Sequence, residues 1–86
     1  MTLQLEILSP SRTVLQTECQ WVQLPGALGE LTVLPSHIPM LAQLGKGMIH
    51  VRQAQGGDVE PARVAIAGGV AWVEQDHVRI LCDDDA

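Results

Sequence analysis

The chain has 86 residues, which is enough for one domain and leaves no room for a second independent core. It is 47% hydrophobic but has only two aromatic residues, Trp21 and Trp72, so its core must be built from aliphatic side chains. The formal charge of −5 and the scattered Lys and Arg residues exclude a basic face for nucleic acid, and we expect a soluble, cytoplasmic protein because no signal peptide and no apolar run of ~20 residues is present.

The first quarter of the chain predicts β-strands. Apolar and polar residues alternate from Thr2 to Leu8, which is typical of a half-buried strand, and Ser9 to Arg12 forms a turn around Pro10. The next segment has apolar residues at helical spacing, but its Thr and Val content and its missing helix-end signals favour strands. We expect two strands here, at about Thr13 to Cys19 and Gln20 to Leu24.

The stretch from Pro25 to Gly47 combines proline and glycine around two short apolar runs. Because Pro fixes φ and Gly permits unusual backbone conformations, the stretch cannot be a long helix or a long regular strand. It predicts a strand from Glu30 to Leu34, a corner from Pro35 to Pro39, a short apolar run and a tight turn at Gly45 to Gly47.

The second half of the chain continues the strand pattern. Strands are expected at Met48 to Gln53, Val59 to Ala67, Val70 to Glu74 and His77 to Leu81, with a hairpin loop at Ala54 to Asp58. Pro61 favours an edge or bulge position, and Gly68-Gly69 favours a bulge or a close backbone contact. Eight to ten short strands without a convincing helix predict an all-β fold, an antiparallel β-sandwich or flattened barrel of two roughly five-stranded sheets.

Motifs for catalysis and for metal or cofactor binding are missing from the sequence. The cysteines and histidines stand singly rather than at zinc-ligand spacing, and there is no nucleophile elbow and no phosphate loop. We expect Cys19 and Cys82 to be reduced, partly buried thiols. A metal-dependent enzyme using His37, His50 and Cys82 is a weaker alternative, so we predict a binding protein without a catalytic site, a metal or a cofactor.

The corner region carries a longer pattern, GxxGELxVLPxHxPxL, which begins at Gly26 and ends at Leu41. This pattern resembles the signature of the epsilon subunit of F-type ATP synthases, and the likeness continues through Gly68-Gly69-Val70 to Val78-Arg79-Ile80-Leu81. The resemblance implies the β-sandwich domain of that family over residues 1–86. It also implies a non-catalytic subunit of the central stalk, which links the gamma subunit to the ring of c subunits and couples ion transport to ATP synthesis or hydrolysis.

The resemblance assigns two candidate contact regions. Leu28, Gly29 and Glu30 correspond to the loop that faces the c ring, where an exposed carboxylate gives orientation more than affinity. Pro35, His37, Pro39 and Met40 correspond to the segment that faces gamma. Such a subunit is peripheral on the inner face of the bacterial plasma membrane and does not insert into the membrane. A gamma-facing surface would expose apolar area, which favours weak self-association of the isolated chain.

Departures from the family pattern leave a second hypothesis open. Thr32 and Ser36 stand where the family usually has Gly, and Ile38 stands where Ala is usual, so the corner is expected to follow a slightly different path. These changes motivate the alternative of a free-standing β-sandwich adaptor that has lost the rotary partners. The C-terminal helical domain of typical members is expected to be absent, and with it ATP binding and helix-mediated inhibition. The ending DDDA favours a natural short form over a trimmed chain.

Overall fold

The computed structural model describes residues 1–54 and 61–83, which fold into eight β-strands and no helix. In chain order the strands are β1 (Leu3–Leu8), β2 (Thr13–Gly26), β3 (Gly29–Val33), β4 (Met40–Leu44), β5 (Gly47–Gln53), β6 (Ala62–Ile66), β7 (Gly69–Glu74) and β8 (His77–Cys82). Across these residues there is accordingly no helix long and apolar enough to cross a membrane.

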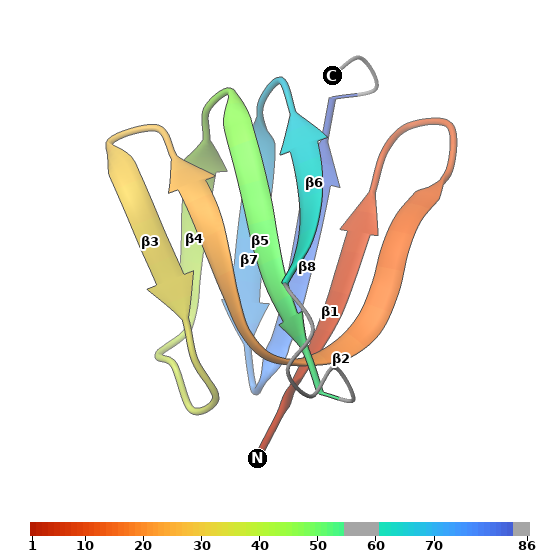
Figure 1. Ribbon diagram of the computed structural model, residues 1–86. Helices are drawn as coiled ribbons and strands as arrows, with labels where there is room; N and C mark the ends of the chain where they lie inside the picture. Colours follow the sequence, from red (N-terminus) through yellow and green to blue (C-terminus); the bar gives the residue numbers. More distant parts are fainter. Residues whose placement is uncertain (55–60, 84–86) are drawn as a thin grey trace.

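The strands form two layers that face each other (Figure 1). The first sheet has the order β2–β1–β8–β7–β4, and the second sheet has the order β3–β2–β5–β6, so β2 belongs to both. The predicted β-sandwich or flattened barrel is confirmed. The prediction that all strands pair antiparallel is wrong at one place, where β1 and β8 run parallel to each other.

β2 corrects the prediction of two separate strands, because Thr13–Gly26 is a single strand of 14 residues. Its first half pairs with β1, and its second half pairs with β3 and β5. The register against β5 shifts between Cys19 and Trp21, so that one extra residue interrupts the ladder there. A bulge of this kind bends a strand and moves the inward-facing positions by one residue. This shift explains why the apolar residues of the segment stand at helical spacing in the sequence.

The core lies between the two sheets and is aliphatic. Burial alternates along each strand, as in Leu3, Leu5 and Ile7 of β1, which are all almost fully buried. Full burial of such a side chain contributes about 1.5–3 kcal/mol. The buried apolar residues are Leu3, Leu5, Ile7, Cys19, Val22, Leu24, Val33, Leu44, Ile49, Val51, Ile66, Ala71, Val73, Val78, Ile80 and Cys82.

The connections gather at two opposite ends of the sandwich (Figure 1). The turns β1–β2, β2–β3, β4–β5 and β6–β7 lie at one end, which we call the hairpin end. The β3–β4 connection and the β7–β8 turn lie at the other end, which we call the corner end, together with the N-terminus. β2 is an exception to a simple end-to-end path, because it leaves the hairpin end after β1, bends at the corner end and returns to the hairpin end before β3 (Figure 1).

Gly69 and the edge strand β6 match two predictions made from the sequence. Gly69 confirms the close backbone contact, because a Cβ atom there would collide with the carbonyl oxygen of Leu81. β6 pairs only with β5 among the described strands, which confirms the edge position predicted from Pro61. The predicted loop at 54–58 and the start of the predicted strand at 59–67 lie largely outside the described residues.

Candidate functional site

The β2–β3 hairpin presents the first group of candidate residues. Gly26 pairs with Gly29, and between them Ala27 and Leu28 form a two-residue loop. Gly29 has φ 137°, a conformation that side chains disfavour, and a Cβ atom on Gly26 would collide with the Gly29 carbonyl oxygen. The two glycines therefore explain the GxxG spacing, and the loop projects the fully exposed Leu28 beside the exposed Glu30.

The neighbouring β4–β5 turn holds this hairpin in place. The Ala27 N–H donates to the carbonyl of Gln43 at 2.9 Å, and the Gly45 N–H donates to the carbonyl of Pro25 at 2.8 Å. Gly47 permits a close approach, because a Cβ atom there would lie 2.7 Å from Cβ of Pro25. Leu28 and Glu30 consequently stand on a braced hairpin rather than on a free loop.

The corner between β3 and β4 holds the second group of candidate residues. Leu34 to His37 forms a turn in which the His37 N–H donates to the Leu34 carbonyl at 3.1 Å, and Ser36 has φ 69°. Proline at the second position and a positive φ at the third define a type II turn. The imidazole Nδ1–H of His37 donates to the carbonyl of Ile38 at 2.7 Å, so the histidine stabilises the corner.

The β7–β8 turn fixes the corner from outside. The carboxylate Oδ1 of Asp76 accepts the Ser36 N–H at 2.6 Å, and the Asp76 carbonyl accepts the Gln4 N–H at 2.8 Å. Asp76 itself has φ 62°, which aspartate tolerates better than most residues do. One residue thus joins the corner, the β7–β8 turn and the start of β1.

The structure shows where the three residues that depart from the family pattern lie. Ser36 takes the left-handed conformation that a glycine would take, and Thr32 pairs regularly with Gln23 in the β2–β3 ladder. Thr32 therefore fits a regular ladder, whereas Ser36 holds a positive φ that a serine adopts only with strain. Ile38 is 73% exposed, so its extra bulk belongs to the surface and not to the core.

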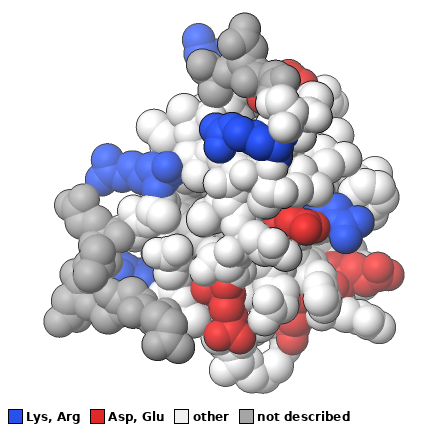
Figure 2. Space-filling view, turned by 90° about the vertical axis from the view of Figure 1, so that its right-hand side faces the viewer, with Lys and Arg blue, Asp and Glu red and all other residues white. Residues whose placement is uncertain are grey.

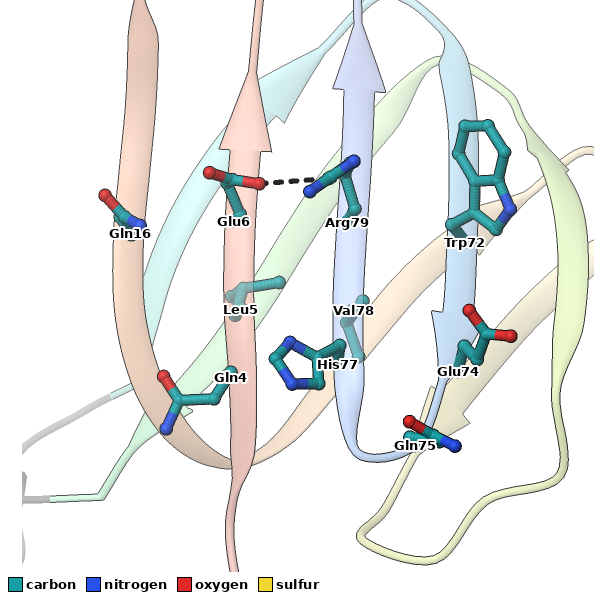
Figure 3. A pocket seen from close by; sticks show the side chains of 10 residues that line it. All are labelled: Gln4, Leu5, Glu6, Gln16, Trp72, Glu74, Gln75, His77, Val78 and Arg79. Atoms are coloured by element: carbon teal, nitrogen blue, oxygen red, sulfur yellow. Dashed lines mark hydrogen bonds and ion pairs between the residues drawn. The ribbon is translucent and has the colours of Figure 1, made fainter.

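A shallow groove of about 730 Å³ lies on the outer face of the first sheet, over β1, β8 and β7 (Figure 3). Glu6 and Arg79 form an ion pair at 3.0 Å in this groove. Trp72 is 49% exposed on the neighbouring strand, with Glu74 beside it. The residues that line the groove are Gln4, Leu5, Glu6, Gln16, Trp72, Glu74, Gln75, His77, Val78 and Arg79.

Charge is distributed unevenly over the molecule. Figure 2 shows acidic side chains gathered over the lower and right-hand parts of one face and basic side chains mainly over its upper and left-hand parts. The outer face of the first sheet carries Glu6, Glu18 and Glu74 against a single cation, Arg79. That face is therefore acidic.

The structure separates the residues that a metal-dependent enzyme would need. His37 lies in the corner, His50 lies on β5 and Cys82 lies at the end of β8. Over residues 1–54 and 61–83, no group of three or more His, Cys, Asp or Glu residues could hold a metal ion. Cys19 and Cys82 are both buried, more completely than the partial burial that the sequence predicted. Burial, with a smaller effect from Glu18, raises the pKa of Cys19 from 9.0 to about 11.

A family model described as the β-sandwich domain of the ATP synthase delta/epsilon chain matches residues 2–85. The chain belongs to this family. The ATP synthase epsilon chain of Lawsonia intracellularis is 39% identical over 82 residues, which cover 95% of this chain and 59% of that protein. The epsilon chain of Synechococcus elongatus is 38% identical over 81 residues, which cover 94% of this chain and 56% of that protein. The chain thus spans somewhat more than half the length of these relatives.

Solved structures show the same fold. A chain of the Euglena gracilis mitochondrial ATP synthase, from a structure of OSCP, F1 and the c-ring, matches with a TM-score of 0.84 and 24% identity. The match covers 94% of this chain and 50% of that chain. A chain of the Tetrahymena thermophila mitochondrial ATP synthase, from a structure of the central stalk and c-ring, matches with a TM-score of 0.80 and 14% identity, covering 98% and 65% of the two chains.

Two features of the delta/epsilon β-sandwich in this chain have no clear signal in the sequence. The hydrogen bond from the Ser36 N–H to Asp76 joins residues 40 positions apart, so no local sequence pattern indicates it. The groove around Trp72 depends on which strands are neighbours. An isolated tryptophan at an outward position of a strand was the one available sign of it.

Proposed function

We propose that this chain is a non-catalytic central-stalk subunit of an F-type ATP synthase, which links the gamma subunit to the c ring. In this role it helps to couple ion transport to the synthesis or hydrolysis of ATP and is held at the membrane through the ring. The observation that carries the proposal is the family match over residues 2–85. The positions of the two candidate contact regions, at opposite ends of one rigid sandwich, support it.

The hairpin end is the proposed contact with the c ring. Leu28 and Glu30 are exposed on the β2–β3 hairpin, which two backbone hydrogen bonds brace against the β4–β5 turn. A braced hairpin loses little conformational freedom on binding, so its contacts contribute more fully to affinity. Gly29 provides the backbone conformation that the hairpin requires.

The corner end is the proposed contact with gamma. Pro35 and His37 belong to the type II turn, and Pro39 leads into β4 at Met40. Exposed apolar side chains surround these residues, with Ile38 at 73% and Leu41 at 67% exposure. Exposed apolar side chains gathered around a fixed turn are typical of a protein interface. The alternative of a free-standing adaptor rests on the substitutions at Thr32, Ser36 and Ile38 alone.

The test is co-purification of the chain with its cognate gamma subunit and a detergent-solubilised c ring. Binding to gamma at micromolar concentration is expected, and its absence would contradict the proposed function. Glu30→Lys should weaken ring association about two- to fivefold, because an exposed charge pair contributes up to about 1 kcal/mol. The thermal stability of this variant should stay close to that of the wild type.

A matched control distinguishes the hairpin from charge in general. Glu18 is also exposed, but it lies toward the corner end, where it accepts hydrogen bonds from Thr2 at 2.9 Å and Gln4 at 3.3 Å. Glu18→Lys should leave ring association unchanged. Equal effects of Glu18→Lys and Glu30→Lys would count against the hairpin as the ring contact.

A further inference from the structure

A row of side chains crosses the outer face of the first sheet. Register pairs place Trp72 opposite Leu41 of β4 on one side and opposite Arg79 of β8 on the other. Arg79 in turn lies opposite Glu6 of β1. Paired residues in a sheet project to the same face, so an apolar half (Leu41 and Trp72) continues directly into a charged half (Arg79 and Glu6). The groove follows this row from Trp72 to Glu6 (Figure 3), and Leu41 continues the row on β4 beyond the residues that line the groove.

The ring of Trp72 is available to a partner. The indole is 49% exposed, and over the described part of the chain the cation–π contact lies elsewhere, between Arg52 and Trp21 at 6.0 Å. Trp72 therefore combines a large apolar surface with an aromatic face that no described cation covers. Tryptophan is one of the side chains that are enriched among the residues contributing most to the binding energy of interfaces.

The groove has a surplus of negative charge. Arg79 is neutralised by its ion pair with Glu6, whose side chain is 30% exposed. Glu74 lies on the same face two residues after Trp72, and no residue in the described ranges forms an ion pair with it. A cationic side chain laid over Trp72 would lie near the Glu74 carboxylate and would gain from both the aromatic face and the charge.

The groove also borders the corner proposed to face gamma. Leu41 follows directly on Met40, and Gln75, which lines the groove, precedes Asp76, which holds Ser36 at 2.6 Å. A partner that covers the corner would reach Trp72 without crossing any other element. Charge and position together therefore define one occupant.

We propose that this groove binds a segment of the gamma subunit that carries a Lys or Arg side chain next to an aliphatic one. The cation lies over Trp72 and pairs with Glu74, and the aliphatic residue packs against Leu41 and Trp72. Glu6 and Arg79 stay paired and bound the site on the β1 side. This assignment rests on the proposed function, because gamma is the partner that the corner is expected to meet.

The first test is binding of purified gamma subunit to the chain and its variants by titration calorimetry. Trp72→Ala should weaken binding about tenfold, and Glu74→Lys should weaken it by at least as much. Met48→Ala is the matched control for the tryptophan, because Met48 is 42% exposed on the second sheet. Asp83→Asn is the control for charge, because Asp83 is exposed at the hairpin end. Both controls should bind gamma as the wild type does.

The second test reports on Trp72 directly. In a Trp21→Phe variant, Trp72 is the only tryptophan, so the emission spectrum comes from the groove alone. Addition of gamma should shift this emission to shorter wavelength as water leaves the indole. Higher salt should weaken binding of the wild type more than binding of Glu74→Gln, because one charge pair is missing in the variant.

The outcomes separate this proposal from the proposed function. Normal gamma binding by Trp72→Ala and Glu74→Lys, with no spectral shift in Trp21→Phe, would overturn the groove assignment and leave the stalk role intact. A wild-type chain that does not bind gamma at all would overturn both. Loss of binding in the Met48→Ala and Asp83→Asn controls as well would show that the effect is not specific to the groove, and would also overturn the assignment.

Discussion

Replacement of Asp76 tests whether the corner is held from outside or folds by its own turn sequence. The Asp76 carboxylate accepts the Ser36 N–H at 2.6 Å, and Asp76 has φ 62°. Asp76→Gly removes the acceptor and keeps the backbone conformation without strain. A hydrogen bond to a charged group is worth about 1.5–3 kcal/mol, and solvent exposure reduces this one to about 1 kcal/mol. The greater freedom of glycine in the unfolded chain adds about 0.5 kcal/mol.

Two further substitutions at the same position make the prediction specific. Asp76→Asn keeps an acceptor and suits a positive φ, so it should cost less than about 0.5 kcal/mol. Asp76→Ala loses the bond and adds left-handed strain of about 1 kcal/mol, for a total of about 2 kcal/mol. The expected order of destabilisation is therefore Asn, then Gly, then Ala.

Thermal unfolding followed by circular dichroism measures this order. About 1.5 kcal/mol in a domain of this size lowers Tm by about 6–12 °C for Asp76→Gly. If the backbone conformation alone mattered, Asp76→Gly would instead be as stable as the wild type or more stable. That result would refute the bridge between the turn and the corner as a stabilising contact.

Three more predictions concern single residues. Ser36→Gly should raise the free energy of unfolding by up to about 1 kcal/mol in urea denaturation, because φ 69° strains a serine, and a lower stability would contradict the turn assignment. Gly69→Ala should cost about 1–3 kcal/mol in the same assay, because its Cβ would strike the Leu81 carbonyl, and a neutral effect would contradict the close approach. For Cys19, the folded-state pKa of about 11 exceeds 9.0, so the stabilisation from the neutral thiol is complete below pH 9.0 and is lost as the pH rises to about 11. Urea denaturation across that range should show a fall in stability that Cys19→Val lacks, and equal pH dependence in both proteins would contradict it.

The alternation of apolar residues predicted most of the fold because each strand buries one face. β1, β3, β7 and β8 were found within one or two residues of their ends, since their inward positions are regularly apolar. β2 was predicted as two strands because the bulge between Cys19 and Trp21 reverses the inward face in mid-strand. Local pattern cannot distinguish a reversed face from a chain break, since both interrupt the period of two.

The candidate contact regions were predicted from the motif between Gly26 and Leu41. The contacts that hold these regions in place have no signal in that motif. Gly26 and Gly29 have an identifiable backbone reason that the sequence could suggest. The bridge from Asp76 to Ser36 and the row from Leu41 to Glu6 depend instead on strand order. Strand order follows from how two sheets close over a shared core, which single-chain periodicity does not encode.

The position of β3 bears on how such a subunit could transmit rotation. Gly29–Val33 is five residues long and spans about 17 Å, and it runs from the hairpin proposed for the ring to the corner proposed for gamma. Its ladder with β2 is continuous from Val22 opposite Val33 to Gly26 opposite Gly29. β2 also pairs with β1, β4 and β5, so a force applied at the hairpin is distributed over both sheets before it reaches the corner. In the proposed role, β2 is therefore the element that connects the two contact regions to both sheets.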